Sequence, residues 1–581
     1  MKSNSIYNTA KVVMAALSLG AMTTACTDWD DHYEANSSEI GSSTASLWEN
    51  ISSNKDLSDF AALAKKAGYD KILSASQAYT VWAPLNGSFD YESLNNLDAE
   101  TLKKQFLQNH VSHFNYPASG SINEKVFMVN EKMNIFEGNG QYTMGGLKVV
   151  TPNIANANGI MHTIDGKLDF NFNIYESLNA DYYPLDSISA YFARYDRKQL
   201  DVNNSVKGPV VDGEITYLDS VFTEYNLMAN MVGAYIDRED SSYTMIMPTN
   251  KAWESRLNEI KAMYEYIPEY VYFREFPKTL TGADAAENKT KELIDNVYLA
   301  DSLTHLQMLP SLFYNNNLYD NVKLKDLQTG GTLNADSLYS TCGTKLYSED
   351  AADIFVGAEK VERSNGAIWV TDTLRFKPWV YKPYIKIEAE WAKSLDLFAN
   401  NFNSNVSSVN VTPADINKEV EGKLSNFSYL EVRPALPSSN PEVDFYLPGI
   451  RKGKYVLYIG VVPANIDSKT FNPEVKPNLF QVKAGYHDLK GNLKETTLGS
   501  KFENDPAKID TMRIGEIDFP VATAGLSNAH PYIRILSRVT SSTNDTRDRT
   551  LRIDFIQLIP KELDDYIKEH PGYKWEDESD K

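Results

Sequence analysis

The sequence predicts a multidomain chain in which two α+β domains are followed by an all-β sandwich. Three observations predict this fold class. An eleven-residue stretch occurs twice, as YTVWAPLNGSF at residues 79–89 and as YTMIMPTNKAW at residues 243–253. Each copy is followed by an Asn-Gly turn that leads into a mostly apolar strand, at residues 158–168 and 365–374. From residue 385 onward, alternating apolar and polar runs are separated by turn-forming clusters, which is typical of antiparallel sandwiches.

Residues 1–25 are predicted to be a lipoprotein signal peptide. Lys2 and Lys11 are its only charged residues, residues 12–25 are nearly all apolar or small, and Cys26 follows directly. The apolar run is too short to span a bilayer. Residues 23–26, TTAC, resemble a bacterial lipobox, in which the cysteine is acylated. The alternative is an ordinary secretory signal in which Cys26 has no role.

Residues 26–45 are predicted to be an acidic, flexible tether, because they are polar and show little apolar periodicity. Four acidic residues follow Cys26 closely: Asp28, Asp30, Asp31 and Glu34. This cluster resembles the export signal that places some lipoproteins of Gram-negative, glycan-degrading bacteria on the outside of the outer membrane. We therefore expect a lipid-anchored outer-membrane protein that faces the cell exterior. The periplasmic side is the alternative.

The cysteine content and the net charge limit the bonds and partners that we expect. If Cys26 carries lipid, Cys342 is the one other cysteine, so no disulfide is expected within the chain. The formal net charge of −21 repels nucleic acid and anionic lipid surfaces. We therefore expect no nucleic-acid partner, and we expect the acyl group alone to hold the chain in outer-membrane lipid.

The first α+β domain is expected over residues 46–180. Ser46 and Glu49 have the spacing of a capping box and start a first helix. A second helical pattern covers residues 57–64 and ends at Gly68, a typical C-terminal cap. Residues 79–82 are the first expected strand, and residues 102–111 form a later helix.

The repeated stretch predicts the same local structure in both copies. A buried strand stops at a proline, Pro84 or Pro248, because proline has no N–H to donate to the sheet. Two residues later an asparagine, Asn86 or Asn250, is expected to cap the helix that follows.

Three histidines of the first domain could be read as functional. His110 and His113 have i, i+3 spacing and could be zinc ligands, but no acidic residue or cysteine lies beside them. His162 lies in an otherwise apolar strand. We expect His110 and His162 to be hydrogen-bonded core residues.

The second α+β domain is expected over residues 185–380, with an insertion between its two repeated elements. This tract is longer than in the first copy and includes tyrosine-rich segments at residues 263–273 and 306–319. Such enlargements usually lie on loops and can carry a partner site. Extra packing is the alternative.

Both copies resemble the fasciclin domain family, in which a box like TVFAPTNxAF is followed by a box like NGxxHxIDxVL. The resemblance covers roughly residues 45–380. The residues that carry it are Pro84, Asn86, Phe89, Asn109, His110, His162 and Asp165 in the first copy, and Pro248, Asn250 and Asp372 in the second. The second copy departs from the pattern at Met247, where Ala is usual, and at Trp369, which takes the His place. The resemblance implies two twisted β-sandwiches with packed helices and a role in adhesion or binding.

An all-β domain is expected over residues 384–561, followed by a charged, frayed tail over residues 562–581. Expected strands cover residues 385–391, 444–448, 455–462, 532–539 and 551–559. The segments IEAEW, GKYVLYIG and LRIDFIQLIP resemble, in that order, the first, a central and the last strand of carbohydrate-binding jelly rolls of the galactose-binding-like kind.

Three carboxylates of this domain form a candidate metal site. Glu388 and Glu390 have i, i+2 spacing and should share one face of a strand, and Asp554 lies among apolar neighbours in the last strand. In the jelly rolls that this domain resembles, the first and last strands are adjacent, and acidic residues at these places hold a structural calcium. The alternative is that all three face solvent and bind nothing.

No sequence motif indicates an enzyme. The chain has no G-x-S-x-G, H-E-x-x-H, P-loop, G-x-G-x-x-G or EF-hand pattern, although its 78 acidic residues leave paired-carboxylate chemistry open. We therefore expect a non-enzymatic surface lipoprotein that engages surface proteins through tandem fasciclin domains. The alternative is a glycan-capture accessory protein of a polysaccharide-uptake system that binds carbohydrate through its C-terminal jelly roll. No cofactor is expected beyond the structural calcium.

Overall fold

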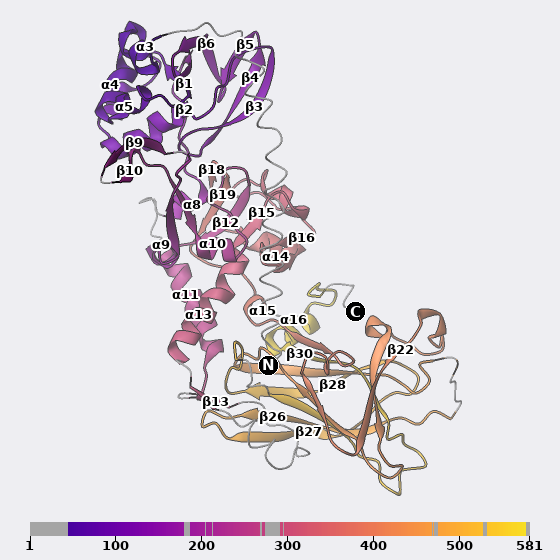
Figure 1. The fold of residues 1–581 in the computed structure, drawn as a ribbon. Helices are drawn as coiled ribbons and strands as arrows, with labels where there is room; N and C mark the ends of the chain where they lie inside the picture. Colours follow the sequence, from indigo (N-terminus) through magenta and orange to yellow (C-terminus); the bar gives the residue numbers. More distant parts are fainter. Residues whose placement is uncertain are drawn as a thin grey trace.

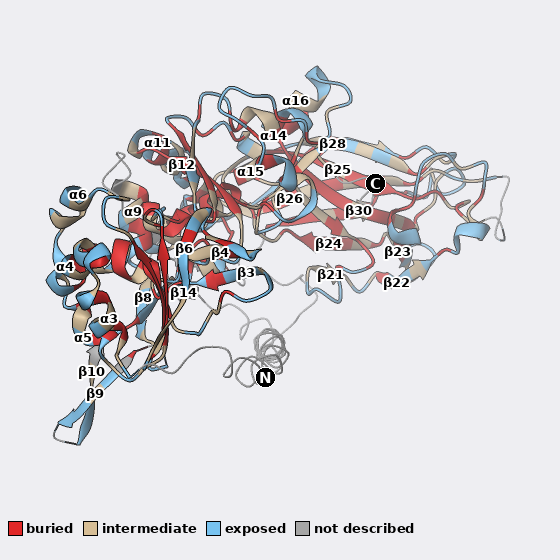
Figure 2. Cartoon of the chain, turned by 90° about the horizontal axis from the view of Figure 1, so that it is seen from above, coloured by how far each residue is buried: buried red, intermediate tan, exposed pale blue. Residues whose placement is uncertain are grey.

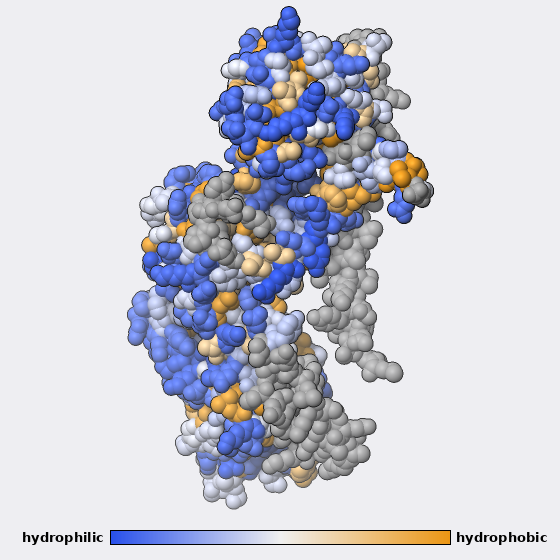
Figure 3. Space-filling model, turned by 90° about the vertical axis from the view of Figure 1, so that its left-hand side faces the viewer, coloured by the Kyte–Doolittle hydropathy of each residue, from blue (hydrophilic) through white to orange (hydrophobic). Residues whose placement is uncertain are grey.

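The computed structural model describes residues 44–178, 186–203, 205–211, 213–267, 270–272, 291–293, 296–467, 469, 474–526 and 531–576. The signal peptide, Cys26 and nearly all of the tether lie outside these residues. The described chain forms three bodies in a row: module 1 (residues 44–169), module 2 (170–382) and a sandwich (383–560) (Figure 1). Most residues on the face shown in Figure 3 are hydrophilic, and hydrophobic ones are scattered among them. Among the helices of the described residues, none is long and apolar enough to cross a membrane.

Module 1 packs short helices against one mixed sheet with the strand order β2-β1-β7-β6-β5-β4-β3. The helices are α3 (Leu47–Ser53), η1 (Lys55–Leu57), α4 (Ser58–Lys66), α5 (Tyr69–Leu73), α6 (Tyr91–Asn95), α7 (Ala99–Leu102), η2 (Lys103–Leu107) and η3 (Gln108–His110). The strands are β1 (Tyr79–Pro84), β2 (Val111–Ser112), β3 (Ser121–Phe127), β4 (Met133–Asn139), β5 (Gln141–Met144), β6 (Leu147–Asn156) and β7 (Gly159–Ile164). Ser46 and Glu49 form the expected capping box. The helix expected over residues 102–111 is instead split into α, π and 3₁₀ turns.

Module 2 repeats this plan around a smaller sheet with the order β15-β12-β19-β18. Its helices are α8 (Ile174–Leu178), α9 (Asp186–Ala193), α10 (Leu227–Met231), α11 (Asn250–Lys261), η4 (Ala262–Tyr264), α13 (Asn296–Met308), η5 (Leu309–Leu312), η6 (Tyr319–Leu324), α14 (Ser348–Asp353) and α15 (Pro378–Tyr381). The strands of its sheet are β12 (Tyr243–Pro248), β15 (Phe313–Asn315), β18 (Glu359–Arg363) and β19 (Gly366–Thr371).

Further strands of module 2 pair only with one another, among the described residues. They form four two-stranded ribbons: β8 (Asp196–Leu200) with β11 (Phe222–Asn226), β9 (Val206–Val211) with β10 (Glu214–Asp219), β13 (Tyr270–Tyr272) with β14 (Lys291–Leu293), and β16 (Ser337–Tyr339) with β17 (Lys345–Tyr347). The β9–β10 ribbon projects from the body (Figure 2). β10 contacts α5 of module 1, and Val221 belongs to the core of module 1. The sequence did not predict this overlap of the two modules.

The sandwich consists of two facing antiparallel sheets. One sheet has the order β22-β23-β30-β25-β28, with β20 also paired to β30, and the other has the order β21-β24-β29-β26-β27. The strands are β20 (Ile385–Glu388), β21 (Phe398–Asn400), β22 (Ser404–Asn410), β23 (Ser428–Pro434), β24 (Glu442–Tyr446), β25 (Gly453–Val461), β26 (Leu479–His487), β27 (Leu493–Glu503), β28 (Asp510–Phe519), β29 (Tyr532–Ser537) and β30 (Leu551–Pro560); short 3₁₀ turns η7 (Pro413–Asp415) and η8 (Ser425–Phe427) join some of them. Figure 2 shows the buried residues concentrated on β24, β25 and β30.

Two expectations for this region are wrong: the end of its first strand and the absence of structure in its C-terminal tail. The first strand was expected to run through residue 391, but β20 ends at Glu388 and a turn carries Glu390. The frayed tail expected over residues 562–581 begins instead with the helix α16 (Lys561–Glu569), which buries Leu563 and Asp564. Glu562, Lys568 and Glu569 of the same helix are exposed, so a charged composition concealed an amphipathic pattern.

Three residues of the sandwich pack into the hydrophobic core of module 2. Ala522, Ala524 and Leu526 of the sandwich belong to the core cluster of module 2. The Tyr266 hydroxyl donates to the Ala524 carbonyl at 2.8 Å, and the Ala522 N–H donates to the Glu265 carbonyl at 2.7 Å. These contacts fix the sandwich against the module 2 side of the chain.

Candidate functional site

The two repeated boxes form the centre of each module as a pair of parallel strands. In module 1, β1 pairs with β7 from Tyr79 opposite Gly159 to Pro84 opposite Ile164. In module 2, β12 pairs with β19 in the same register, from Tyr243 opposite Gly366 to Pro248 opposite Thr371. Each proline is the last residue of its strand, as expected for a residue without an N–H.

The asparagine of each Asn-Gly pair connects three segments. The Asn158 side chain accepts the Leu47 N–H of α3 at 2.8 Å and donates to the carbonyls of Leu73 and Ala75. In module 2 the Asn365 side chain accepts the Ile174 N–H of α8 at 2.9 Å. It also donates to the carbonyls of two residues just before β12: Ile236 and Arg238. The sequence indicated only turns here, but both asparagines are buried and their side chains hydrogen-bond segments that are far apart in the chain.

In each copy of the repeated stretch, which we call the Pro box, the asparagine two residues after the proline caps a helix that comes earlier in the chain. Asn86 accepts the Asp59 N–H at 3.0 Å at the start of α4, and Asn250 accepts the Ser187 N–H at 3.0 Å in the first turn of α9. The expectation that these residues cap the following helix is therefore wrong. Sequence proximity favoured the next helix, whereas the fold brings an earlier N-terminus to the end of the strand.

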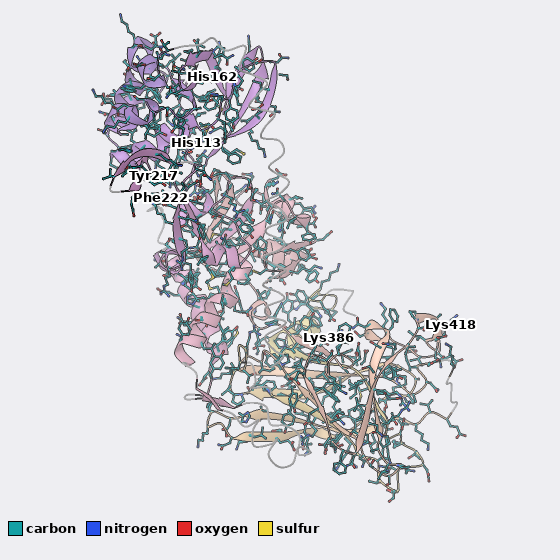
Figure 4. All side chains as sticks on the ribbon, in the orientation of Figure 1. His113, His162, Tyr217, Phe222, Lys386 and Lys418 are labelled. Atoms are coloured by element: carbon teal, nitrogen blue, oxygen red, sulfur yellow. The ribbon has the colours of Figure 1, made fainter. Side chains whose placement is uncertain are left out.

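Both core histidines of module 1 are held by the backbone. His110 accepts the Leu168 N–H at Nε2 (2.9 Å) and donates from Nδ1 to the Phe106 carbonyl (2.7 Å). His162, labelled in Figure 4, accepts from Asn153 at Nδ1 (3.3 Å) and donates from Nε2 to the Tyr116 carbonyl (2.9 Å). Burial lowers the pKa of each ring to about 4. Both rings are thus neutral and already hydrogen-bonded at neutral pH.

Three other box residues, Trp369, Asp372 and Asp165, lie within or just after the second strand of each pair. Trp369 of module 2 takes the place of His162 and packs edge-on against Phe355, with ring centroids 4.9 Å apart. Asp372 accepts the Thr249 hydroxyl at 2.8 Å, which ties the end of β19 to the end of β12. Asp165 is exposed, and its N–H donates to the Lys148 carbonyl.

A buried lysine connects module 1 to module 2. Lys132, in the turn between β3 and β4, places Nζ 2.6 Å from Glu176 and 2.7 Å from Glu239 of module 2. Its side chain is 6% exposed, and the same Nζ lies 3.4 Å from the Ser364 hydroxyl. Two carboxylates on one buried ammonium satisfy its charge and its donors. Sequence reasoning missed this contact, because its members lie far apart in the chain.

Beside this contact, a cavity of about 270 Å³ lies between the modules. Its lining includes Lys104, Glu131, Phe222, Asp237 and other polar residues of both modules. Phe222, labelled in Figure 4, lies near the junction of the modules. Burial raises the pKa of Asp237, and burial together with the charge of Asp237 raises that of Glu131.

Of the three carboxylates predicted from the sequence, Glu388 and Asp554 meet at one residue, Ser425, and Glu390 is held by another, Ser428. Ser425 connects two of them, since its N–H donates to Asp554 Oδ2 at 3.2 Å and its hydroxyl donates to Glu388 Oε1 at 2.9 Å. The Ser428 hydroxyl donates to Glu390 Oε1 at 2.6 Å. Burial, and then the charges of the two glutamates, raise the pKa of Asp554 to about 8. Burial also raises the pKa of Glu390.

Each of these carboxylates has one oxygen that is buried and has no hydrogen-bond partner among the described residues. These atoms are Glu388 Oε2, Glu390 Oε2 and Asp554 Oδ1. Such orphaned oxygens suit a hard cation such as calcium, which takes oxygen ligands. Within the described part of the chain, however, no three or more His, Cys, Asp or Glu side chains are placed as a metal-holding group. The carboxylates would have to shift, and backbone or hydroxyl oxygens would have to complete the ligand set.

A lysine already supplies one positive charge to this cluster. Lys386, labelled in Figure 4, places Nζ 3.0 Å from Glu388 Oε1 and 3.3 Å from the Ser425 hydroxyl. The ammonium also lies 4.9 Å from the ring centroid of Phe555. Lys386 is two residues before Glu388 on β20, so alternation along the strand places both on one face.

Comparison with known proteins identifies one part of the chain. A model of the fasciclin domain family matches residues 55–169. None of the curated proteins matches the chain.

Several solved structures have some likeness to the chain at low identity. A fasciclin-domain (FAS1) pair from the insect cell adhesion molecule Fasciclin I is 16% identical, with a TM-score of 0.19, and covers 56% of this chain and 98% of its own. The CBM22-1 xylan-binding domain of Paenibacillus barcinonensis Xyn10C is 10% identical, with a TM-score of 0.20, over 30% of this chain and 94% of its own. A Paenibacillus xanthan lyase is 13% identical, with a TM-score of 0.20, over 34% of this chain and 16% of its own. At such TM-scores these likenesses carry no argument.

The family match and the strand topology together establish the coarse organisation. The matched residues span the first Pro box, both core histidines and the β1–β7 pair. The sheets of the C-terminal region form a separate two-sheet core. The chain therefore contains a fasciclin domain at residues 55–169, followed later by a β-sheet-rich C-terminal region.

Proposed function

We propose that this chain is a non-enzymatic binding protein of the adhesion class, with module 1 and module 2 acting as tandem fasciclin domains. The observation that carries the proposal is the fasciclin match at residues 55–169. The equal registers of β1–β7 and β12–β19 support the extension to module 2. The proposed partners are proteins of the cell surface.

The joints between the bodies support a scaffold role. Lys132 ties module 1 to Glu176 and Glu239 of module 2, and Ala522, Ala524 and Leu526 of the sandwich pack into the core of module 2. Removing one partner of a buried ion pair costs about 3–5 kcal/mol, so both glutamates depend on Lys132 while the joint is closed. A chain with two such joints holds module 1 at a fixed distance from the sandwich, which suits a protein that presents a binding surface.

The state of the buried histidines supports a role without catalysis for module 1. His110 and His162 have both ring nitrogens engaged, and their lowered pKa values keep them neutral at pH 7. A general acid or base needs a pKa near the working pH and access to a substrate. Neither ring meets these conditions.

We further propose that acylation of Cys26 anchors the protein in the outer membrane, with the body facing the cell exterior. The apolar segment that ends at Cys26 and the acidic residues after it support this proposal. A structural calcium between β20 and β30 is also proposed, supported by the orphaned oxygens of Glu388, Glu390 and Asp554.

Glycan capture by the sandwich, as a jelly-roll domain, is the second candidate function. The observation that favours it is a hydrogen-bonded cluster of polar and aromatic side chains on β24, β29 and β27, which reaches the surface at Glu495. There Arg534 binds Asp444 through two hydrogen bonds of 2.7 and 2.8 Å. Arg534 also binds Glu495 at 3.0 Å, and Glu495 accepts the Tyr532 hydroxyl at 3.0 Å. An ordered array of this kind suits the hydroxyl groups of a sugar.

The two candidates are separated by an adhesion assay with the whole chain displayed on cells that lack it. If the fasciclin modules act in adhesion, the displaying cells should adhere to wells coated with the same chain carrying Cys26→Ser, and soluble Cys26→Ser chain should compete. Adhesion only to wells coated with xylan or mucin would support the glycan alternative. Adhesion to neither coating would overturn both.

A further inference from the structure

Tyr319 of module 2 has an unusual backbone and an exposed side chain. It is the first residue of η6, its φ is 50°, and its side chain is 70% exposed. A bulky residue in the left-handed region costs about 1–3 kcal/mol, and such strain is typically found at functional sites. Burial does not explain a tyrosine at this position, because the residue is mostly exposed.

Tyr319 belongs to a row of aromatic rings, the tyrosine row. Its ring centroid lies 4.7 Å from that of Tyr339, at an interplanar angle of 38°. The Lys345 ammonium lies 5.1 Å from the ring centroid of Tyr339 and 4.6 Å from that of Tyr347. Three tyrosines and one ammonium thus lie side by side on η6, β16 and β17.

The β16–β17 ribbon presents two rings and the ammonium on one face. Leu338 and Leu346 pair across the ribbon and are both buried. Because side chains alternate along a strand, Tyr339, Lys345 and Tyr347 lie on the opposite, outer face. The two buried leucines pack the ribbon against the core of module 2, so the positions of the outer residues are fixed.

A buried amide holds Tyr319 beside this ribbon. Asn321, on η6, accepts the Tyr339 N–H at 3.0 Å and donates to the Tyr339 carbonyl at 2.8 Å. Asp320 accepts the Asp336 N–H, just before β16, at 3.1 Å. These bonds tie η6 to β16 immediately next to Tyr319. The hydrogen bonds of the next two residues therefore hold the backbone of Tyr319 in its strained conformation, as expected of a preorganised binding site.

We propose that the tyrosine row binds the sugar rings of a neutral oligosaccharide. The negative face of an aromatic ring complements the C–H groups of a pyranose ring, and tyrosine provides a polar hydroxyl beside that face. Asn317, which is exposed, and Lys345, which is partly exposed, can hydrogen-bond sugar hydroxyls. A row of three rings matches a short stretch of polysaccharide, whereas a protein partner needs about 800 Å² of buried surface on each side.

This site lies on η6, β16 and β17, between the two boxes of module 2, so it is separate from both those boxes and the sandwich. It therefore goes beyond the proposed adhesion function and differs from the sandwich surface of the glycan alternative. β16 and α14 lie at the side of module 2 toward which the sandwich extends (Figure 1).

Affinity electrophoresis of the whole chain carrying Cys26→Ser tests the proposal, in gels containing laminarin, xylan or galactomannan. At least one polysaccharide should retard the chain. Tyr319→Gly should weaken that binding roughly tenfold, because a stacked ring is lost. The same variant should keep or raise the thermal midpoint, since glycine accepts φ of 50° without strain. This combination separates loss of a binding ring from loss of the fold.

Tyr298→Ala is the matched control, because Tyr298 is 72% exposed in the same module but lies on α13. It should leave the retardation unchanged. Retardation of the Cys26→Ser chain by none of the three polysaccharides would overturn the proposal. So would equal retardation of Tyr319→Gly and its parent, or binding of a polyproline peptide instead of a polysaccharide.

Discussion

Gly159 lies so close to Tyr79 that a Cβ atom on the glycine would be 1.9 Å from the tyrosine carbonyl oxygen. Gly366 and Tyr243 have the same relationship in module 2, also at 1.9 Å. The φ angles of the two glycines are 144° and 137°, values that residues with a Cβ atom rarely adopt. The Asn-Gly pair of each box is therefore required by the approach of two parallel strands, in addition to its turn.

Gly159→Ala should destabilise module 1 by more than about 3 kcal/mol. The added methyl group would overlap the Tyr79 carbonyl oxygen, and because that oxygen belongs to the backbone of β1, the strands would have to move apart. Urea unfolding of the whole chain measures this change. Gly87→Ala is the control, because Gly87 also has positive φ, 75°, but nothing lies within 4 Å of its Cβ position. Its cost should stay near 1 kcal/mol. Equal losses for both variants would contradict the close-approach explanation.

Lys132→Met should weaken the joint between the modules by about 3 kcal/mol, because Glu176 and Glu239 would be left facing one another without a cation. Thermal unfolding should show an earlier transition, and small-angle scattering should show a longer molecule. Lys104→Met is the control, since Lys104 is half exposed and lies 3.4 Å from Glu176. It should cost less than about 1 kcal/mol. An unchanged scattering profile for Lys132→Met would argue against the joint.

Some strands of the fold were predictable from sequence, because a strand's pattern is local, whereas β3–β6, β22, β23 and β26–β28 were not predicted. The Pro boxes, β25 and β30 follow from alternation and from prolines at strand ends. The targets of Asn86 and Asn250 were not predictable, since the helix that each caps is chosen by tertiary folding. The same holds for Lys132, whose partners come from another module.

His162→Gln should reveal the pH dependence that burial gives to His162. The pKa is lowered from 6.5 to about 4 in the folded chain, so the unfolded chain binds more protons between these values. The contribution of neutral His162 is thus fully present above pH 6.5 and is lost as the pH falls toward 4. The stability advantage of the wild type over the variant should shrink by roughly 1.4 kcal/mol per pH unit in this window. An advantage that is the same at pH 7 and pH 5 would contradict this expectation.

The proximity of the three carboxylates was predictable only in part. Glu388 and Asp554 were expected on adjacent strands, and β20 does pair with β30. Glu390 reaches the cluster from a turn and not from the strand, and it does so through Ser428. The roles of Ser425 and Lys386 depend on η8 and on side-chain placement, which no sequence pattern indicated.

Calcium should stabilise the whole chain through Asp554, Glu388 and Glu390, because a cation would satisfy three oxygens that are buried without partners. A ligand present at 100 times its Kd stabilises the state it binds by about 2.7 kcal/mol. The thermal midpoint of the sandwich should therefore rise by several degrees in millimolar calcium and fall again with chelator. Asp554→Asn should abolish this response without lowering the metal-free midpoint, since the amide keeps the shape of the side chain and, like a carboxyl whose pKa is raised to about 8, is uncharged at pH 7. Glu516→Gln, an exposed position on β28 of the same sheet, should respond to calcium like the wild type. If calcium leaves the wild-type midpoint unchanged, the three carboxylates are a metal-free cluster in which Lys386 supplies the compensating charge.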